Sequence, residues 1–254
     1  ADSAGFIELD KKTFQIKRTY QDRDYFKSIH EIAFHDDHLW VTSTAYDAIV
    51  KVDLDFNTKG FWKLLGMNAR RGKEPYSRQN SRASAKALTG KEEITAETKT
   101  EYDSYHINSI SVYGNELRVA GLLTPLYDFE TMKEVSSIPL NSTYRNSFVH
   151  NFYEYEDMFV ANLTTFSSIG IFRKGGSFGW DVIDIPRSKN VTYQVDDIAV
   201  NNWNRGLAIQ EGKIIIGSSP ARLLIYDIKR KEFEKEIVLE KDIRHAIHGL
   251  EILE

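Results

Sequence analysis

The sequence predicts an all-β protein, a single five-bladed β-propeller, and three observations support this fold class. A pattern of short strands separated by polar turns occurs four times along the chain. The repeats are spaced close to the roughly 40–50 residues that one blade requires. The last residues resemble the beginning of a repeat, and the first residues resemble its end. We therefore expect residues 1–254 to form one domain of four-stranded antiparallel blades, with the closing blade shared between the termini.

Each repeat alternates apolar and polar residues with a period of two, and β-branched and aromatic residues are enriched in it, which is typical of strands. The first strands of the four repeats begin at His30, Asn108, His150 and Arg205. The second strands begin at Leu39, Glu116, Asp157 and Lys213. The third strands begin at Ala48, Pro125, Ser168 and Arg222. An outer fourth strand follows in most repeats, as in residues 61–65 and 233–239.

The closing blade is expected to combine both ends of the chain. Residues 248–253 repeat the first-strand pattern of residues 205–209, and residues 6–14 repeat the pattern of residues 225–233. In this alignment the second strand of the closing blade is missing from the sequence. We expect the natural protein to carry about ten more residues before Ala1, the length of one strand and its turn.

A long insertion, residues 66–104, separates the first blade from the second. Its first part is strongly basic. The basic residues of this first part are Arg70, Arg71, Lys73, Arg78, Arg82, Lys86 and Lys91. Because the insertion connects two blades, it belongs to the face on which the first strands begin. It can act as a basic lid over that face, or it can be a solvated loop.

Composition excludes several classes of protein. The chain has a formal net charge of −4 and no cysteine, which argues against a nucleic-acid-coating protein and excludes thiolate metal sites and cysteine nucleophiles. No run of about 18 apolar residues is present for a membrane span. We expect neither a nucleic-acid partner nor a membrane partner. The compartment stays open, with the cytoplasm favoured, and so does the oligomeric state.

The starts of the first strands suggest a site on the propeller axis. In the repeat alignment the equivalent starting residues are His30, Asn108, His150, Arg205 and His248. Imidazole is a common ligand of zinc, iron and copper, and three histidines with an open fourth position form a known catalytic arrangement. We expect a metal on His30, His150 and His248. Arg205 would orient an anionic substrate group, and Asn108 would bind substrate or complete the coordination shell. The alternatives are a metal-free polar pocket and purely structural residues.

Turns between the second and third strands open on the same face and can line a pocket. The expected substrate-binding residues are Tyr46, Phe166, Trp203, Arg222 and His106. Asp47 can serve as an acid–base group or cap a turn, and the sequence does not decide between these roles.

The patterns at residues 30–34, 105–110 and 205–209 resemble those of a broad family of small β-propellers, many of them uncharacterised bacterial proteins. The resemblance covers nearly the whole chain and implies the fold rather than an activity. Five-bladed relatives include glycosidases and lectins, but the paired carboxylates of a glycosidase are not evident. Two functions follow. One is a metal-dependent enzyme acting on a small anionic or polyhydroxylated substrate, with hydrolase, lyase and oxidoreductase chemistry undecided. The alternative is a non-catalytic propeller that binds a glycan or partner through the same face.

Overall fold

The protein is all-β, as the sequence predicts, and its sheets are consistent with a five-bladed propeller. The computed structural model describes residues 5–66, 88–101, 103–122, 124–136, 148–175, 180–189, 191–192 and 202–252. Two compact units make up the chain. The first comprises Ala1–Asn80 and Ala85–Ser137, and the second comprises Ser81–Ser84 and Ile138–Glu254.

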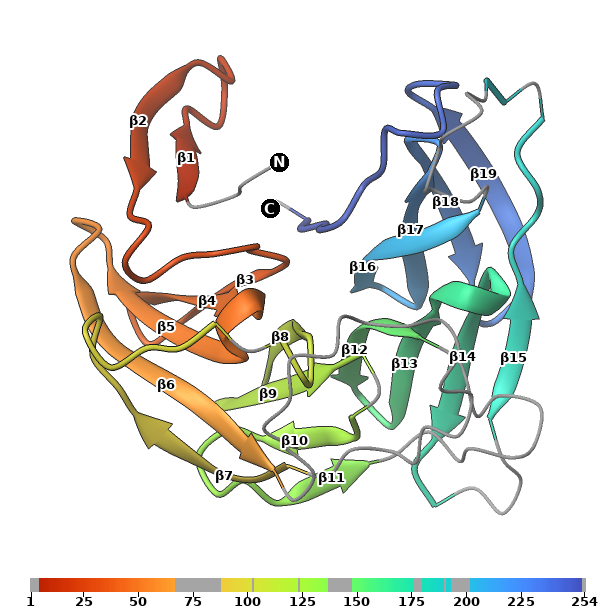
Figure 1. Ribbon diagram of the computed structural model, residues 1–254. Coiled ribbons are helices and arrows are strands. Elements are labelled where there is room, and N and C mark those ends of the chain that lie inside the picture. The colour runs from red at the N-terminus through yellow and green to blue at the C-terminus, as the bar shows by residue number, and fades with distance from the viewer. Residues whose placement is uncertain are drawn as a thin grey trace. The chain divides into compact units, whose positions relative to one another are not determined.

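The first unit contains two complete blades (Figure 1). Blade one consists of β3 (Ile32–His35), β4 (His38–Ser43), β5 (Ala48–Asp53), β6 (Thr58–Gly66) and β7 (Leu88–Glu93). Blade two consists of β8 (Ile107–Tyr113), β9 (Glu116–Gly121), β10 (Leu126–Asp128) and β11 (Glu134–Ser136). In each blade the neighbouring strands pair antiparallel in sequence order.

The core of the first unit lies where the two blades face each other, because alternate residues of each strand point to that side. Ile49 of β5 and Ile107 and Val119 of blade two are fully buried in one apolar cluster. Trp40 stacks on Trp62, with ring centroids 5.5 Å apart, and Phe129 of the turn after β10 packs edge-on against both rings. Long-range contacts of this kind fix each blade against its neighbour.

The second unit repeats this design (Figure 1). Blade three consists of β12 (Val149–Tyr155), β13 (Met158–Leu163), β14 (Ser168–Arg173) and β15 (Asp181–Asp184). Blade four consists of β16 (Trp203–Gln210), β17 (Lys213–Ser219), β18 (Arg222–Asp227) and β19 (Glu232–Val238). Val160, Ile169, Leu207 and Ile216 are fully buried between the two blades. The strands of all four repeats therefore confirm the expected pattern.

A matching one-turn 3-10 helix follows the second strand in blades one and three. The helices are η1 (Thr44–Tyr46) and η2 (Thr164–Phe166). Each ends at a residue with left-handed backbone, Asp47 with φ 49° and Ser167 with φ 52°. These connections therefore have the same geometry in the two units.

Part of the insertion at residues 66–104 forms a strand. Residues 88–93 form β7, which pairs with β6 as a fifth strand of blade one. Leu88 supplies an apolar anchor, since its side chain is buried in the core cluster and its N–H donates to the Tyr127 hydroxyl at 3.0 Å. The basic residues from Arg70 to Lys86 lie outside the described residues, so the expected lid stays a prediction. Lys91 lies over the Phe129 ring and pairs with Glu130.

The closing blade is present only in part. β1 (Gly5–Leu9) and β2 (Ile16–Gln21) form a two-stranded antiparallel sheet, which corresponds to the expected third and fourth strands. A first strand was expected at residues 248–253, but residues 248–252 contain no strand. The segment still packs on blade four, because the Ile247 side chain lies over Gly206 and Gly217 and its N–H reaches the Ser218 carbonyl at 3.5 Å. Within the described residues, β1 and β2 pair only with each other and no strand of the C-terminal segment joins them.

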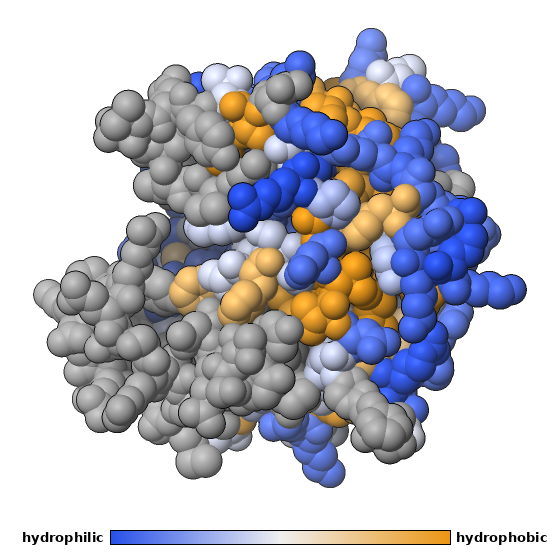
Figure 2. Space-filling view, turned by 90° about the vertical axis from the view of Figure 1, so that its right-hand side faces the viewer, coloured by the Kyte–Doolittle hydropathy of each residue, from blue (hydrophilic) through white to orange (hydrophobic). Residues whose placement is uncertain are grey.

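The surface mixes polar and apolar residues. Figure 2 shows hydrophilic side chains interspersed with apolar ones over one face of the molecule. None of the described segments forms a helix with the length and hydrophobicity that crossing a bilayer would need.

Candidate functional site

The register of the blades places His30 and His150 at equivalent positions. The Thr44 hydroxyl of η1 lies 2.9 Å from Nδ1 of His30 and donates to the Ile107 carbonyl at 2.6 Å. The Thr164 hydroxyl of η2 lies 3.0 Å from Nδ1 of His150 and donates to the Asn204 carbonyl at 2.7 Å. The same hydrogen-bonded unit therefore holds a histidine in blades one and three.

The expectation that five residues share one starting position needs correction. The pairing of the first and second strands skips one residue in three blades, which leaves Asn108, Asn151 and Arg205 as bulge residues. Arg205 and Asn108 are thus equivalent to Asn151, one residue beyond the position of His150. Bulges re-aim side chains, and sequence spacing does not reveal them. His30 and His150 form one set, while Asn108 and Arg205 belong to another.

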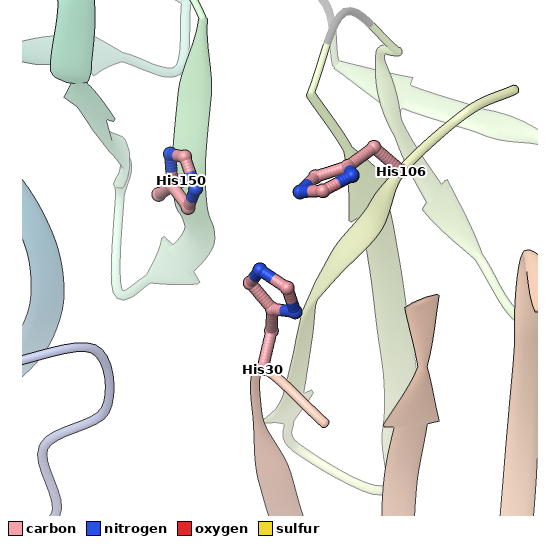
Figure 3. Close-up of side chains that lie close together, drawn as sticks. All are labelled: His30, His106 and His150. Atoms are coloured by element: carbon pink, nitrogen blue, oxygen red, sulfur yellow. The ribbon is translucent and has the colours of Figure 1, made fainter. Parts of the chain in front are cut away.

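His106 lies beside His30 in the first unit. Their ring centroids are 4.9 Å apart with an interplanar angle of 76°, and a ring nitrogen of one lies within 4.8 Å of a ring nitrogen of the other. Figure 3 shows these two rings turned toward each other. The expected substrate contact of His106 stays a prediction, and the structure shows His106 as a neighbour of the predicted metal ligand His30.

Two acidic residues hold His106 in place. Asp103, a residue not predicted for the site, approaches Nδ1 of His106 with both oxygens, at 3.0 and 2.9 Å. Asp47 accepts hydrogen bonds from the backbone N–H groups of Ser104 at 2.6 Å, Tyr105 at 3.0 Å and His106 at 2.8 Å. The spacing of Asp103 and His106, three residues apart, is the sequence signal that could have identified this pair.

The environment of Asp47 favours a structural role. Its side chain is fully buried. Burial raises the pKa of Asp47 to about 6, although the backbone donors at residues 104–106 act in the opposite direction. Both oxygens are occupied by the turn that carries His106. Of the two roles left open by the sequence, the structure shows the turn cap.

The ring hydrogens of the three histidines follow from their partners. Nδ1 of His30 lies 3.0 Å from the Ser28 carbonyl, which only accepts, so Nδ1 carries a hydrogen. Nδ1 of His106 faces the Asp103 carboxylate and is a donor for the same reason. The Thr164 hydroxyl already donates to Asn204, so it accepts from Nδ1 of His150. In the neutral form each ring therefore has its lone pair on Nε2, the arrangement of a metal-binding histidine fixed by an outer partner.

His248 has a different partner, in the second unit. Nη1 of Arg205 donates to Nε2 of His248 at 2.8 Å, so this nitrogen uses its lone pair as an acceptor. The ring centroids of His248 and His150 are 6.4 Å apart. The role of His248 as a metal ligand stays a prediction, and coordination through Nε2 would require the bond to Arg205 to break.

The expected pocket walls lie in different environments. Tyr46 is buried against Phe61, with ring centroids 6.0 Å apart. Arg222 is fully buried and donates to Ser218, Glu236, Pro186 and Asn202. Tyr46 and Arg222 are therefore buried inside the protein, and the guanidinium of Arg222 is hydrogen-bonded to protein acceptors.

The other expected site residues are placed as follows. Phe166 is 37% exposed at the end of η2. Trp203 is half-buried, with the Arg205 guanidinium 4.5 Å from its ring centroid. Asn108 is buried on β8.

Comparisons with known proteins leave the family open. No family model and no curated protein matches the chain. One similar solved structure is a protein of unknown function from Bacteroides caccae, with a TM-score of 0.49 and 6% identity over 93% of this chain and 69% of that one. A second is the computationally designed Ika8 protein, with a TM-score of 0.49 and 9% identity over 100% of this chain and 86% of that one.

A third similar structure is virginiamycin B lyase from Staphylococcus aureus, with a TM-score of 0.45 and 11% identity over 85% of this chain and 56% of that one. Because the TM-scores are below 0.5, none of these likenesses bears on function. The class that fold and site define is an all-β protein of antiparallel blades with oriented histidines where blades one and three begin.

Proposed function

We propose that the protein is a metal-dependent enzyme whose divalent transition metal is bound through Nε2 of His30, His106 and His150. The observation that carries this proposal is the shared ring orientation: each histidine has a hydrogen-bond acceptor at Nδ1, which places the lone pair of the neutral ring on Nε2. Zinc, iron and copper all accept imidazole nitrogen in this form.

The distance between His30 and His106 is compatible with a shared ion. Two nitrogens bound at about 2.0–2.1 Å with tetrahedral angles lie roughly 3.3 Å apart. The ring nitrogens of His30 and His106 lie within 4.8 Å, so small rotations of the rings would bring them to that separation. Asp103 would then act as the outer carboxylate that orients His106 and increases its basicity.

His150 is the third ligand because it repeats His30. In the propeller predicted by the sequence repeats, equivalent residues at the starts of first strands face one axis. Both histidines depend on a threonine hydroxyl that also spans to the next blade.

When bound, a metal of this kind polarises a substrate oxygen or activates water. The reaction class stays open among hydrolase, lyase and oxidoreductase chemistry, and the proposed substrate is small and anionic or polyhydroxylated. The protein's own contribution is to hold the imidazoles in the correct tautomer.

Metal analysis by inductively coupled plasma mass spectrometry tests the proposal on untagged protein reconstituted with zinc, iron or copper. We expect about one equivalent per chain, consistent with three histidines around one ion. The His30→Ala/His106→Ala variant should lose it. The matched control is His35→Ala/His38→Ala, which removes two imidazoles from the β3–β4 turn and should retain the metal.

Two single variants sharpen the assignment of ligands. His150→Ala should lose the metal, whereas His248→Ala should retain it, because Nε2 of His248 is bonded to Arg205. If His150→Ala retained the metal and His248→Ala lost it, His248 and not His150 would be the third ligand. A wild-type protein that takes up no metal would overturn the proposal and leave the glycan- or partner-binding propeller as the better hypothesis.

A further inference from the structure

Arg205 is a half-buried arginine whose charge has no counterion among the described residues. Burial lowers the pKa of this guanidinium, and no carboxylate of the described residues contributes to its electrostatic environment. Arg222 of the same unit shows the contrast, since Glu236 accepts from its Nη1 at 2.6 Å. Placing a guanidinium in a partly desolvated position without a counterion is costly, which makes such a position a receptor for an anion.

The orientation of Arg205 is fixed by three features of the second unit. It is the bulge residue of β16, so its side chain departs from the regular alternation of the strand. Its guanidinium carbon lies 4.5 Å from the centroid of the Trp203 ring. Its Nη1 donates to Nε2 of His248 at 2.8 Å. An aromatic ring and a hydrogen-bond acceptor together hold the guanidinium in place before any ligand arrives.

We propose that Arg205, positioned by Trp203 and His248, binds a singly charged carboxylate group of a small ligand. Arginine suits a planar oxyanion because its N–H groups match the spacing of the two oxygens. His248 accepts from Arg205 at Nε2 and is therefore neutral in this contact, so Arg205 supplies the only permanent positive charge among the contacts described for this group. One such charge matches a carboxylate better than a doubly charged phosphate.

This inference rests on the proposed function in one respect: the carboxylate is assigned to the substrate of the metal site. Binding of the carboxylate itself needs only Trp203, Arg205 and His248, which all belong to the second unit. The two proposals can therefore fail separately.

The test follows the side-chain Nε–H signals of arginine by NMR in ¹⁵N-labelled, metal-stripped full-length protein. Acetate is the probe, and sodium chloride at equal ionic strength is the reference. The Arg205 signal is identified by its loss in Arg205→Lys. We expect acetate to shift this signal saturably while the Arg222 signal stays unchanged, because Arg222 is enclosed by protein acceptors. An Arg205 signal that responds to acetate no more than to chloride would overturn the inference.

Calorimetric titration compares the affinities of variants. Arg205→Lys keeps the charge but loses the planar fork, so acetate should bind at least about tenfold more weakly. Arg173→Met, at an exposed arginine of blade three, should bind like the wild type. Equal affinity of the wild type and Arg205→Lys contradicts the inference, as does tighter binding of inorganic phosphate than of acetate.

The metal-site variant separates the two proposals. His30→Ala/His106→Ala should bind acetate like the wild type, because the contacts that position Arg205 come from Trp203 and His248. An acetate response that persists in protein unable to bind metal supports the carboxylate site and rejects only the metal. Loss of the metal-independent acetate response in this variant would contradict the assignment to Arg205.

Discussion

The Thr44 hydroxyl lies 2.9 Å from Nδ1 of His30 and, together with the Ser28 carbonyl, fixes which nitrogen of that ring carries the hydrogen. The same hydroxyl donates to the Ile107 carbonyl at 2.6 Å and thereby links blade one to blade two. One side chain therefore serves both the packing of the blades and the orientation of a candidate ligand. Thr164 does the same for His150 in the second unit.

Removing the hydroxyl in Thr44→Val should lower both stability and metal affinity. The Ile107 carbonyl would lose its donor in a buried position, which costs about 1–3 kcal/mol of unfolding free energy. Loss of an outer hydrogen-bond partner of a metal-binding histidine lowers the affinity for the metal by roughly 10–100-fold. Urea unfolding and competition with a chelator measure the two effects. Thr164→Val is the matched change in the second unit and should behave alike. A Thr44→Val protein with unchanged metal affinity would show that the hydroxyl serves packing alone.

Asp47→Asn should destabilise the protein. The amide would direct an N–H₂ group at backbone N–H donors of residues 104–106, where the carboxylate now accepts from all three. We expect a loss of about 1–3 kcal/mol, measured by urea unfolding at neutral pH. Ser167→Ala changes the corresponding residue after η2 and should cost less than about 0.5 kcal/mol. A stable Asp47→Asn protein lacking activity would instead favour the acid–base role.

Asp128 gives blade two a stability that depends on pH. Burial acts to raise the pKa of Asp128, but hydrogen bonds from Thr131 and the charges of Arg118 and Lys91 outweigh it and lower that pKa below its usual value. The folded protein therefore releases this proton more readily than the unfolded chain. The resulting stabilisation is present above about pH 4 and is lost as the pH falls through the folded-state pKa.

The measurement is the melting temperature of the wild type and of Asp128→Asn between neutral pH and about pH 3, the range in which aspartate titrates. The difference in melting temperature by which the wild type exceeds Asp128→Asn should shrink as the pH falls. Parallel curves for the two proteins across this range would contradict the prediction.

Gly217→Ala should displace the segment around Ile247 from blade four. A Cβ at Gly217 would lie 2.5 Å from Cγ2 and 2.7 Å from Cβ of Ile247, closer than packed carbon atoms allow. We expect the free energy of unfolding to fall by about 1–3 kcal/mol and proteolysis after residue 244 to become faster. Gly90→Ala on β7, where a Cβ meets nothing within 4 Å, is the control and should leave stability nearly unchanged. Equal stability of both variants would show that the segment is not fixed on the blade.

The sequence by itself determined the strands of four blades, because period-two alternation depends on residues that are neighbours in the chain. It also identified His30 and His150 as residues at the starts of blades. Blade register was not determined, since the bulges at Asn108 and Arg205 depend on pairing with the second strand. Nor did the pattern show that residues 88–93 add a fifth strand to blade one.

Only the tertiary structure decided which side chains meet. His106 lies beside His30 because Asp47, 59 residues earlier, accepts hydrogen bonds from the turn that carries it. His248 bonds to Arg205, and Arg222 is enclosed by four protein partners. Such contacts join residues far apart in the chain. Local patterns determine where a strand forms and which of its side chains share a face. The partner of a side chain depends on how the blades pack together.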